Sequence, residues 1–456
     1  MIEIRAFFKK NVAGMILAAL MAMLGIVIDG IVIARYLGPQ SMAAYGLITP
    51  LTNMGMMCSA IFSSGTQILC AQRIGADDKK GARRIFSMCV LATLVLTLGL
   101  MLLLFFGRDS LAVMLGATGD AAGLLPLCSD YMFGMLFSIP FVFFLLEFNG
   151  LMRLDGDSNR IIIAVVAMTI LDVSGDFLNA LVIHGGMFGM GLTSSISYCI
   201  AFLLTLPHFR RKDIIFRFSL KGLRPMDLWD ILVTGSSSAL GFGSSILRSR
   251  ALNELMLAST AAITATAALS IMNNVLNVTS STMAGMGNTC SMMAGLIYGK
   301  KDRLKAEELL LVTMKYALSI AAIFFVLLFP FAPVVTQIFT GKVSGDIATY
   351  VIKGMRIYAA GVFLYGINAA YISYTQGMRR IAYANTITFL ENFAFIVLPA
   401  LLLFRWLDAD AVWVSFPATE ILTFIFIYLT TSLRRGAIPT TLKDFTYDTY
   451  ENINSK

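Results

Sequence analysis

Residues 12–34 read VAGMILAALMAMLGIVIDGIVIA, an apolar run interrupted by a single carboxylate. About 20 consecutive apolar residues are enough for an α-helix to cross the hydrocarbon core of a bilayer. The run is too long for the apolar core of a secretory signal, so we expect it to be the first membrane span. Backbone polar groups inside a bilayer must be paired within the segment itself, which favours a helix.

The rest of the 456-residue chain repeats this pattern. Hydrophobic residues make up 57% of the sequence and charged residues only 14%, and the mean hydropathy is +0.78, which excludes a water-soluble protein. We therefore expect an all-α membrane protein with twelve transmembrane helices. The predicted spans are residues 12–34, 44–71, 86–106, 123–150, 161–183, 189–208, 229–257, 263–297, 309–333, 350–376, 384–404 and 411–432.

The basic residues predict the orientation of these spans. Alternate connections are rich in Lys and Arg, as in residues 73–84, 210–224 and 300–305, whereas the connections between them carry few. Basic connections face the cytoplasm, so both termini are predicted to be cytoplasmic, with the chain in the cytoplasmic (inner) membrane. Because the net charge of +8 is divided among short loops and forms no single basic face, we expect no nucleic-acid partner.

The longest basic connection, PHFRRKDIIFRFSLKGLRP at residues 207–225, separates two halves of six spans each. Related segments recur in both halves, since AQRIGADDKKGARR at 71–84 resembles GLIYGKKDRLKAEE at 295–308, and MRLDGDSNR at 152–160 resembles TQGMRRIAY at 375–383. Two bundles related by a pseudo-two-fold axis along the membrane normal are typical of transporters. The predicted parts are an N-terminal six-helix bundle at 1–208, a basic cytoplasmic linker at 209–225, a C-terminal six-helix bundle at 226–435 and a cytoplasmic tail at 436–456.

We single out three carboxylates inside spans of the first half. Asp29 is in span one, and Asp172 and Asp176 share one face of span five in TILDVSGDFLN. At about 1.5 Å per residue from the cytoplasmic anchors, they lie at depths of roughly 28, 18 and 24 Å. Three ionised acids at similar depth would repel one another, so a proton or a cation must sit among them. The alternative is that each acid has its own hydrogen-bond partner and only fixes helix packing.

Hydroxyl groups on span six complete this predicted cation-coupling site. Thr193 and Ser194, with Ser195 beside them, supply the oxygen ligands that a hard cation such as Na⁺ prefers. Asn179, after the fifth span's acids, is a further polar candidate that we assign to the substrate cavity.

Charged residues inside spans of the second half give further candidates. Glu391 lies near the middle of span eleven, and Arg248 lies well along span seven; we place both in the substrate cavity. Glu254 is predicted to lie at the outer membrane surface, where it can pair with Arg250.

In the first half, Glu147 is close enough to the end of its span, and to Arg153, to extend toward the cytoplasmic boundary.

The sequence contains no Walker loop, no His/Glu metal motif and no nucleophile elbow. We therefore expect no enzymatic activity, no cofactor and no ATPase subunit.

Three short motifs stand in a characteristic order. Asp29 precedes RYLG at 35–38, IGADDK at 74–79 follows span two, and RLDGD at 153–157 follows span four. In this order and spacing the chain resembles the MATE (multidrug and toxic compound extrusion) transporters over nearly its whole length.

The resemblance implies residue roles. Family members carry an Asn-x-x-x-Asp pair on span five that joins the span-one Asp in a cation site, with a hydroxyl ligand from span six near Thr193 or Ser194. Here Asp172 occupies the Asn position and Asp176 the Asp position. An acid that the family often has early in span seven is absent, since Ser244, Ser245 and Ile246 lie there, and an acidic position on span ten corresponds to Asn368, which we add to the substrate cavity.

The expected function is secondary active antiport, in which H⁺ or Na⁺ enters the aspartate cluster and an organic, amphipathic cation leaves from a cavity between two rocking bundles. The expected partners are a small-molecule substrate and the lipid bilayer, and the chain is expected to act as a monomer. Two alternatives stay open: a flippase or exporter of a lipid-linked or anionic solute, suggested by Arg248, Arg250 and Arg356, and a membrane scaffold or receptor that transports nothing.

Overall fold

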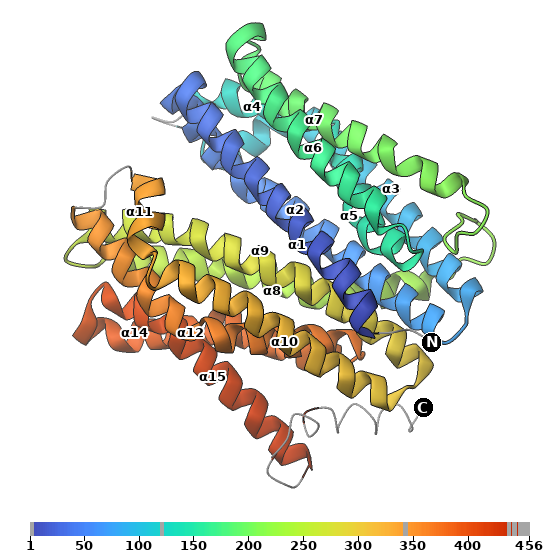
Figure 1. Cartoon of the computed structure of the whole chain (residues 1–456). Coiled ribbons are helices and arrows are strands. Elements are labelled where there is room, and N and C mark those ends of the chain that lie inside the picture. Colours follow the sequence, from blue (N-terminus) through green and yellow to red (C-terminus); the bar gives the residue numbers. More distant parts are fainter. Residues whose placement is uncertain (1–3, 119–122, 341–344, 436–438, 440–444, 446–456) are drawn as a thin grey trace. The chain divides into compact units, whose positions relative to one another are not determined.

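The computed structural model describes residues 4–118, 123–340, 345–435, 439 and 445. Every regular element in these ranges is helical (Figure 1). Each of the twelve predicted spans coincides with one helix or with a run of consecutive helices, which confirms the predicted fold class. By length and hydropathy, eight helices in the described ranges could cross a membrane by themselves, or nine when a bent pair is counted as one span.

The chain forms two compact units, which we call the N-terminal unit (residues 13–235) and the C-terminal unit (residues 1–12 and 236–456). The first boundary lies inside helix α1 (Ile4–Val32) and the second inside helix α8 (Pro225–Leu257). The predicted domain boundaries at 208, 225 and 435 stay predictions, and most of the predicted tail at 436–456 lies outside the described residues.

The N-terminal unit consists of long helices joined by short turns. Gly38, with φ of 90°, separates the end of the first span from α2, which begins with Pro39. The fourth span is broken by a bend of 51° between α4 and α5. The unit begins within α1. Its further elements are η1 (Ile33–Leu37), α2 (Pro39–Gly75), α3 (Lys79–Met114), α4 (Leu125–Met135), α5 (Ser138–Leu154), α6 (Ser158–Leu178), η3 (Asn179–Ile183), α7 (Gly186–Thr205) and η4 (Leu206–Arg210).

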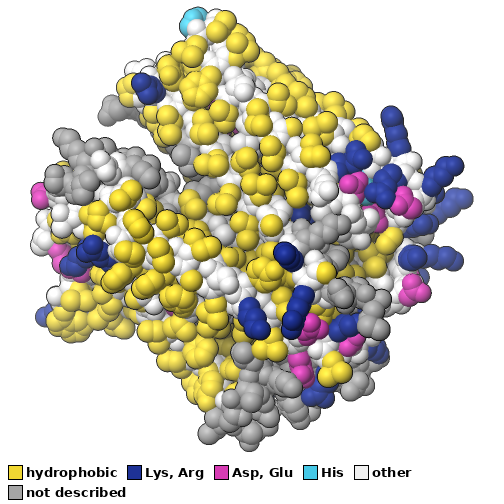
Figure 2. All heavy atoms as spheres, in the orientation of Figure 1, with side chains coloured by type: hydrophobic (Ala, Val, Ile, Leu, Met, Phe, Trp, Pro, Cys, Tyr) yellow, Lys and Arg dark blue, Asp and Glu magenta, His cyan; other side chains and the backbone are white. Residues whose placement is uncertain are grey.

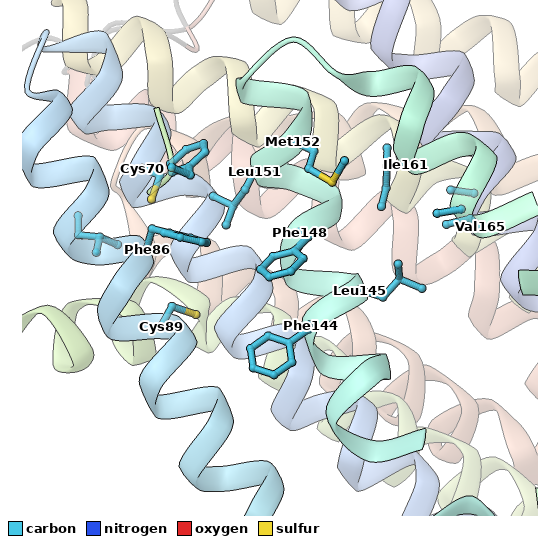
Figure 3. Packing of buried hydrophobic residues seen from close by; sticks show 14 of the residues in the cluster. Cys70, Phe86, Cys89, Phe144, Leu145, Phe148, Leu151, Met152, Ile161 and Val165 are labelled. Carbon is cyan, nitrogen blue, oxygen red and sulfur yellow. The ribbon is translucent and has the colours of Figure 1, made fainter. Parts of the chain in front are cut away.

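An aromatic core holds one end of this unit together. Phe86 of α3 packs against Phe148 of α5, with ring centroids 6.2 Å apart, and Ile161 of α6 is fully buried in the same cluster. Figure 3 shows these side chains converging from α3, α5 and α6. Phe216, from the predicted linker, is also fully buried there. The core therefore includes a residue from a segment that the sequence predicts only as a connection.

The segment after η4 is fastened to the N-terminal unit. The backbone N–H of Ile215 donates to Asp155 Oδ1 at 2.9 Å, and the Arg83 guanidinium donates to the carbonyl of Ile215 at 2.9 Å. Arg84 forms a two-pronged ion pair with Asp227, with N···O distances of 2.6 and 3.1 Å. The contacts of Ile215 hold the basic connection against the ends of α3 and α5, and the Arg84–Asp227 pair holds the start of α8 against α3.

The C-terminal unit is built around α12, which packs against α9, α10 and α15. Gly361 of α12 permits close approach to α15, since a Cβ atom there would lie 2.9 Å from the Cα of Pro417. After the C-terminal part of α8, its elements are α9 (Ala262–Lys300), α10 (Arg303–Leu328), α11 (Ala332–Thr340), α12 (Asp346–Gly377), α13 (Ile381–Phe389), η5 (Leu390–Ala394), α14 (Phe395–Leu407) and α15 (Asp410–Arg435).

The repeated segments adopt matching turns in the two units. In the first pair, a residue with positive φ precedes an aspartate N-cap: Asp77 (φ 60°) precedes Asp78, and Lys301 (φ 55°) precedes Asp302. Each cap accepts a hydrogen bond from the backbone N–H three residues later, at 2.8 and 3.2 Å. In the second pair, Gly156 (φ 83°) precedes α6 and Arg379 (φ 61°) precedes α13.

Large apolar side chains remain exposed along the spans. Phe106, Ile263 and Leu402 are 79%, 87% and 67% exposed. Figure 2 shows apolar side chains over much of the visible face, whereas the basic side chains gather mainly on part of it. Such an apolar exterior is unfavourable in water and favourable in a lipid bilayer.

The crossing of α2 and α8 inside the N-terminal unit depends on a missing side chain. A Cβ atom at Gly65 would lie 2.2 Å from the carbonyl oxygen of Ile231. Gly65→Ala should therefore lower the melting temperature of the detergent-purified protein, because overpacking costs about 1–3 kcal/mol. Gly46→Ala, in the same helix, is the matched control, since its Cβ would meet no atom within 4 Å. Equal melting temperatures for the two variants would contradict this close crossing.

Candidate ion-coupling site

The three aspartates predicted from sequence meet inside the N-terminal unit. Asp29 of α1 and Asp172 and Asp176 of α6 are 9%, 6% and 0% exposed. The carboxyl groups of Asp29 and Asp176 lie within hydrogen-bonding reach of each other, and Asp172 is close enough to interact electrostatically with both. The structure thus brings together the acids that the sequence places at similar depth.

Helix α7 supplies hydroxyl groups to this cluster. Thr193 Oγ1 donates to Asp176 Oδ1 at 2.6 Å, and Ser197 Oγ lies 3.2 Å from Asp172 Oδ1. Ser194 also hydrogen-bonds with Asp172. Ser195 faces elsewhere, since its hydroxyl donates to the carbonyl of Gly134 at 2.7 Å.

Ser197 is the contact that sequence reasoning missed. It lies four residues after Thr193 and therefore on the same face of α7, a spacing that was available in the sequence. Its hydroxyl donates to the carbonyl of Thr193 at 2.6 Å, which holds the side chain beside the aspartates.

Irregular helical turns flank the acids. The π-helical segment η1 begins four residues after Asp29, and η3 begins three residues after Asp176. The two segments touch, and the rings of Tyr36 and Phe177 meet edge to face with centroids 6.1 Å apart. Isolated π-turns are frequent at functional sites because they redirect side chains that a regular helix would place elsewhere.

The cluster contains unsatisfied oxygen atoms. Asp29 Oδ1 and Asp176 Oδ2 are buried and have no donor partner among the described residues. Among those residues no group of three His, Cys, Asp or Glu side chains has the arrangement of a metal site. The carboxyl and hydroxyl oxygens suit a hard cation, whereas two carboxyl groups in mutual contact suit a bound proton.

Asn179 has a structural position beside the cluster. Its side-chain amide accepts from the backbone N–H of Gly185 at 3.0 Å and donates to the carbonyl of Gly186 at 3.0 Å, closing the turn into α7. The side chain is 1% exposed. Its predicted place in a substrate cavity stays a prediction.

The remaining candidates lie together in the C-terminal unit. Asn368 of α12 donates to Glu420 of α15 at 2.9 Å, and Arg248 of α8 is close enough to interact electrostatically with both Glu391 and Glu420. Sequence reasoning missed Glu420, although it stands 14 residues before Arg434, roughly 21 Å along a helix. That depth was the available signal.

Two other acids, Glu254 and Glu147, were placed near the membrane surface from the sequence, and the structure treats them differently. Glu254 is exposed and forms the predicted pair with Arg250 at 3.0 Å, and its place at the outer membrane surface stays a prediction. The expectation for Glu147 was wrong, because its side chain is 1% exposed and accepts a hydrogen bond from Thr93 at 3.0 Å. Glu147 points into the interface of α5 with α3, so it cannot extend toward the membrane boundary.

The chain is similar to transporters in both sequence and structure. It is 29% identical over 196 residues to the multidrug export protein MepA of Staphylococcus saprophyticus, a match that covers 42% of each chain. It is 21% identical over 426 residues to the probable multidrug resistance protein YoeA of Bacillus subtilis, covering 91% of this chain and 90% of that protein.

Solved structures show the same fold. A MATE family transporter in an outward-facing conformation superposes with a TM-score of 0.87 at 23% identity, covering 94% of this chain and 96% of the other. A MOP superfamily transporter from Pyrococcus furiosus gives a TM-score of 0.86 at 23% identity, with coverage of 96% and 97%. The MatE family model matches residues 15–178 and 248–400, which is more than half of the sequence. The chain therefore belongs to the MATE family of membrane transporters.

Proposed function

We propose that this protein is a secondary active antiporter that exports amphipathic organic cations in exchange for protons. The observation that carries the proposal is the contact between the buried carboxyl groups of Asp29 and Asp176, with Asp172 beside them. Family membership supports transport, and the relatives described as multidrug export or resistance proteins support an organic drug-like cargo.

The electrostatics of the cluster favour a proton as the coupling ion. Two unit charges of the same sign 4 Å apart repel by about 4 kcal/mol at an effective dielectric constant of 20. The groups that interact with Asp29 and Asp176 are the other aspartates of the cluster and the Thr193 hydroxyl. A proton between the two carboxyl groups removes this repulsion, and its loss restores it.

Proton binding can bias transport if one conformation keeps the carboxyl groups together and another separates them. The ion then shifts the equilibrium by the difference in its affinity for the two states. Thr193 and Ser197 position Asp176 and Asp172 for this exchange through their hydrogen bonds. Cargo movement through a cavity between two rocking bundles is the arrangement we propose for the other half of the cycle.

The location follows from the sequence. We place the protein in the cytoplasmic membrane with both termini inside, because the basic connections favour that side, and we propose that it acts as a monomer.

Export of an anionic or lipid-linked solute is less well supported. Arg250 is paired with Glu254, and Arg248 lies near Glu391 and Glu420, so their charges are balanced within the protein.

Asp29→Asn should abolish coupling, because the pair loses its exchangeable carboxyl group while keeping its shape. In proteoliposomes, export of a cationic dye driven by a pH gradient should fall by roughly tenfold or more, equivalent to about 1.4 kcal/mol of lost coupling. Asp109→Asn, at the exposed end of α3, is the matched control and should transport normally. Normal coupled export by Asp29→Asn, or wild-type export that requires a sodium gradient and ignores the pH gradient, would contradict the proposal.

Thr193→Val should also reduce proton-driven export, because it removes the donor to Asp176 without changing side-chain volume much. A buried acceptor that loses its partner costs about 1–3 kcal/mol, so we expect a reduction of roughly fivefold or more in the initial rate. Thr193→Ser retains the hydroxyl and should recover most of the rate. If Val and Ser variants behave alike, the hydrogen bond has no part in coupling.

A further inference from the structure

A largely apolar cavity lies beside the aromatic core of the N-terminal unit. Its volume is about 330 Å³, and its lining comes from α3, α5, α7, η4 and the basic connection that follows η4. Among the described residues that line it, Arg217 alone is charged, and Val90 and Leu206 are aliphatic. The other lining residues are all phenylalanines: Phe86, Phe148, Phe202, Phe209, Phe216 and Phe218. Such a lining favours an apolar ligand.

The cavity has a buried floor and an exposed, apolar mouth. Phe86 and Phe216 are 2% and 0% exposed and belong to the buried cluster, of which Figure 3 shows Phe86 and its neighbour Phe148. Leu206 and Phe218 are 37% and 51% exposed. Leu206 lies in the helical run Gly186–Arg210, which is long and apolar enough to cross a membrane. The mouth is therefore unfavourable in water and suited to contact with lipid.

Hydrogen bonds hold one wall of the cavity in place. The backbone N–H of Ser219 donates to Ser87 Oγ of α3 at 3.0 Å. Ile215 is held through both its N–H and its carbonyl group. Because these anchors stand on either side of Phe216 and Phe218, both rings are carried by a short stretch that is fastened at each end.

A second wall is anchored by His208. This side chain is fully buried, and its two ring nitrogens lie 3.0 Å from Asp157 Oδ2 and 3.2 Å from Asp155 Oδ2. Its ring meets that of Phe209 edge to face, with centroids 5.2 Å apart. The walls are thus in place before a ligand arrives, which lowers the entropy that binding must overcome.

The rim of the cavity is basic. Residues 210–224 contain six Lys or Arg residues and one acid, Asp213, which pairs with Arg211 at 2.5 Å. Arg217 is exposed, and its guanidinium donates to the carbonyl of Lys212 at 2.7 Å, which keeps it beside the connection. This charge favours an anion at the rim and disfavours the organic cations that we propose as cargo.

Volume and charge together select the ligand. Small-molecule sites measure about 300–1,000 Å³, so this cavity has room for a single alkyl chain and is too small for a whole lipid. An anionic phospholipid meets both requirements, because one acyl chain can enter the cavity while the phosphate stays at the rim. A free phosphate ion would leave the aromatic lining unused.

We propose that this cavity binds one acyl chain of an anionic phospholipid, with the phosphate of that lipid held at Arg217. Each buried methylene group contributes about 0.8 kcal/mol through the hydrophobic effect, and the basic rim adds headgroup selectivity. A lipid bound in this way stabilises the N-terminal unit, since it binds only where the connection is folded against α3. The site does not include the aspartate cluster and is independent of the coupling ion.

Native mass spectrometry of the full-length protein, released from detergent micelles, tests this site by counting retained lipids. Phosphatidylglycerol and phosphatidylcholine with identical acyl chains are compared. We expect one phosphatidylglycerol to be retained, with binding roughly fivefold or more tighter than that of phosphatidylcholine. Glycerol phosphate, which carries the charge without the chains, should not be retained.

Two pairs of variants separate the chain from the headgroup. Val90→Phe should weaken retention of both lipids by roughly tenfold or more, because the ring fills the space of several methylene groups. Val95→Phe, at a 64% exposed position of the same helix outside the lining, is its matched control. Arg217→Gln should weaken phosphatidylglycerol binding by about fivefold and leave phosphatidylcholine unchanged, whereas Arg210→Gln, in the same connection, should change neither.

Phe218→Ala removes a half-exposed ring from the mouth, should also weaken retention, and serves if Val90→Phe does not fold. Equal retention of the two lipids by the wild type, retention of glycerol phosphate, or unchanged binding in Val90→Phe or Phe218→Ala would overturn the proposal. An effect of Arg210→Gln equal to that of Arg217→Gln would do the same. The readout involves no transport, so it remains decisive if the proposed antiport is wrong.

Discussion

Mutual contact of buried carboxyl groups is the constraint on which the rest of the N-terminal unit depends. Asp29 comes from α1 and Asp176 from α6, and their contact requires these two helices to face each other at this level. Helix α7 contacts the same cluster through Thr193 and Ser197. Burying acids without a basic partner is unfavourable, so this arrangement persists only where another force holds the helices together. The aromatic cluster around Phe86 and Phe148 provides that force.

The fold was largely predictable because membrane helices can be recognised in a sequence by their length and apolar composition. The twelve predicted spans all coincide with helices, and even the repeated turns before α3 and α10 were visible as similar segments. The aspartate cluster was predictable for a related reason, since depth along a helix can be counted from the nearest basic residue. Counting residues in this way gives the depth of a side chain in the membrane. It does not give the direction in which the side chain points around the helix axis.

That missing direction accounts for the errors. Glu147 was placed at the membrane boundary because Arg153 is near in sequence, yet its side chain turns inward to Thr93 of another helix. Glu420 escaped notice because its partners, Asn368 and Glu391, lie 52 and 29 residues away in the chain, on different helical elements. Contacts of this kind depend on which faces of distant helices meet, and hydropathy carries no information about that.

The attachment of residues 211–224 to the N-terminal unit affects how the protein meets its lipid surroundings. With Ile215 held by Asp155 and by Arg83, the backbone of this connection is already ordered. Ordering a loop ordinarily consumes about 1–2 kcal/mol per residue, so a fastened basic segment can engage phosphate headgroups without that loss. Under the proposed cytoplasmic location of this connection, the basic side chains of Lys212, Arg217 and Lys221 would meet the anionic lipids of that leaflet.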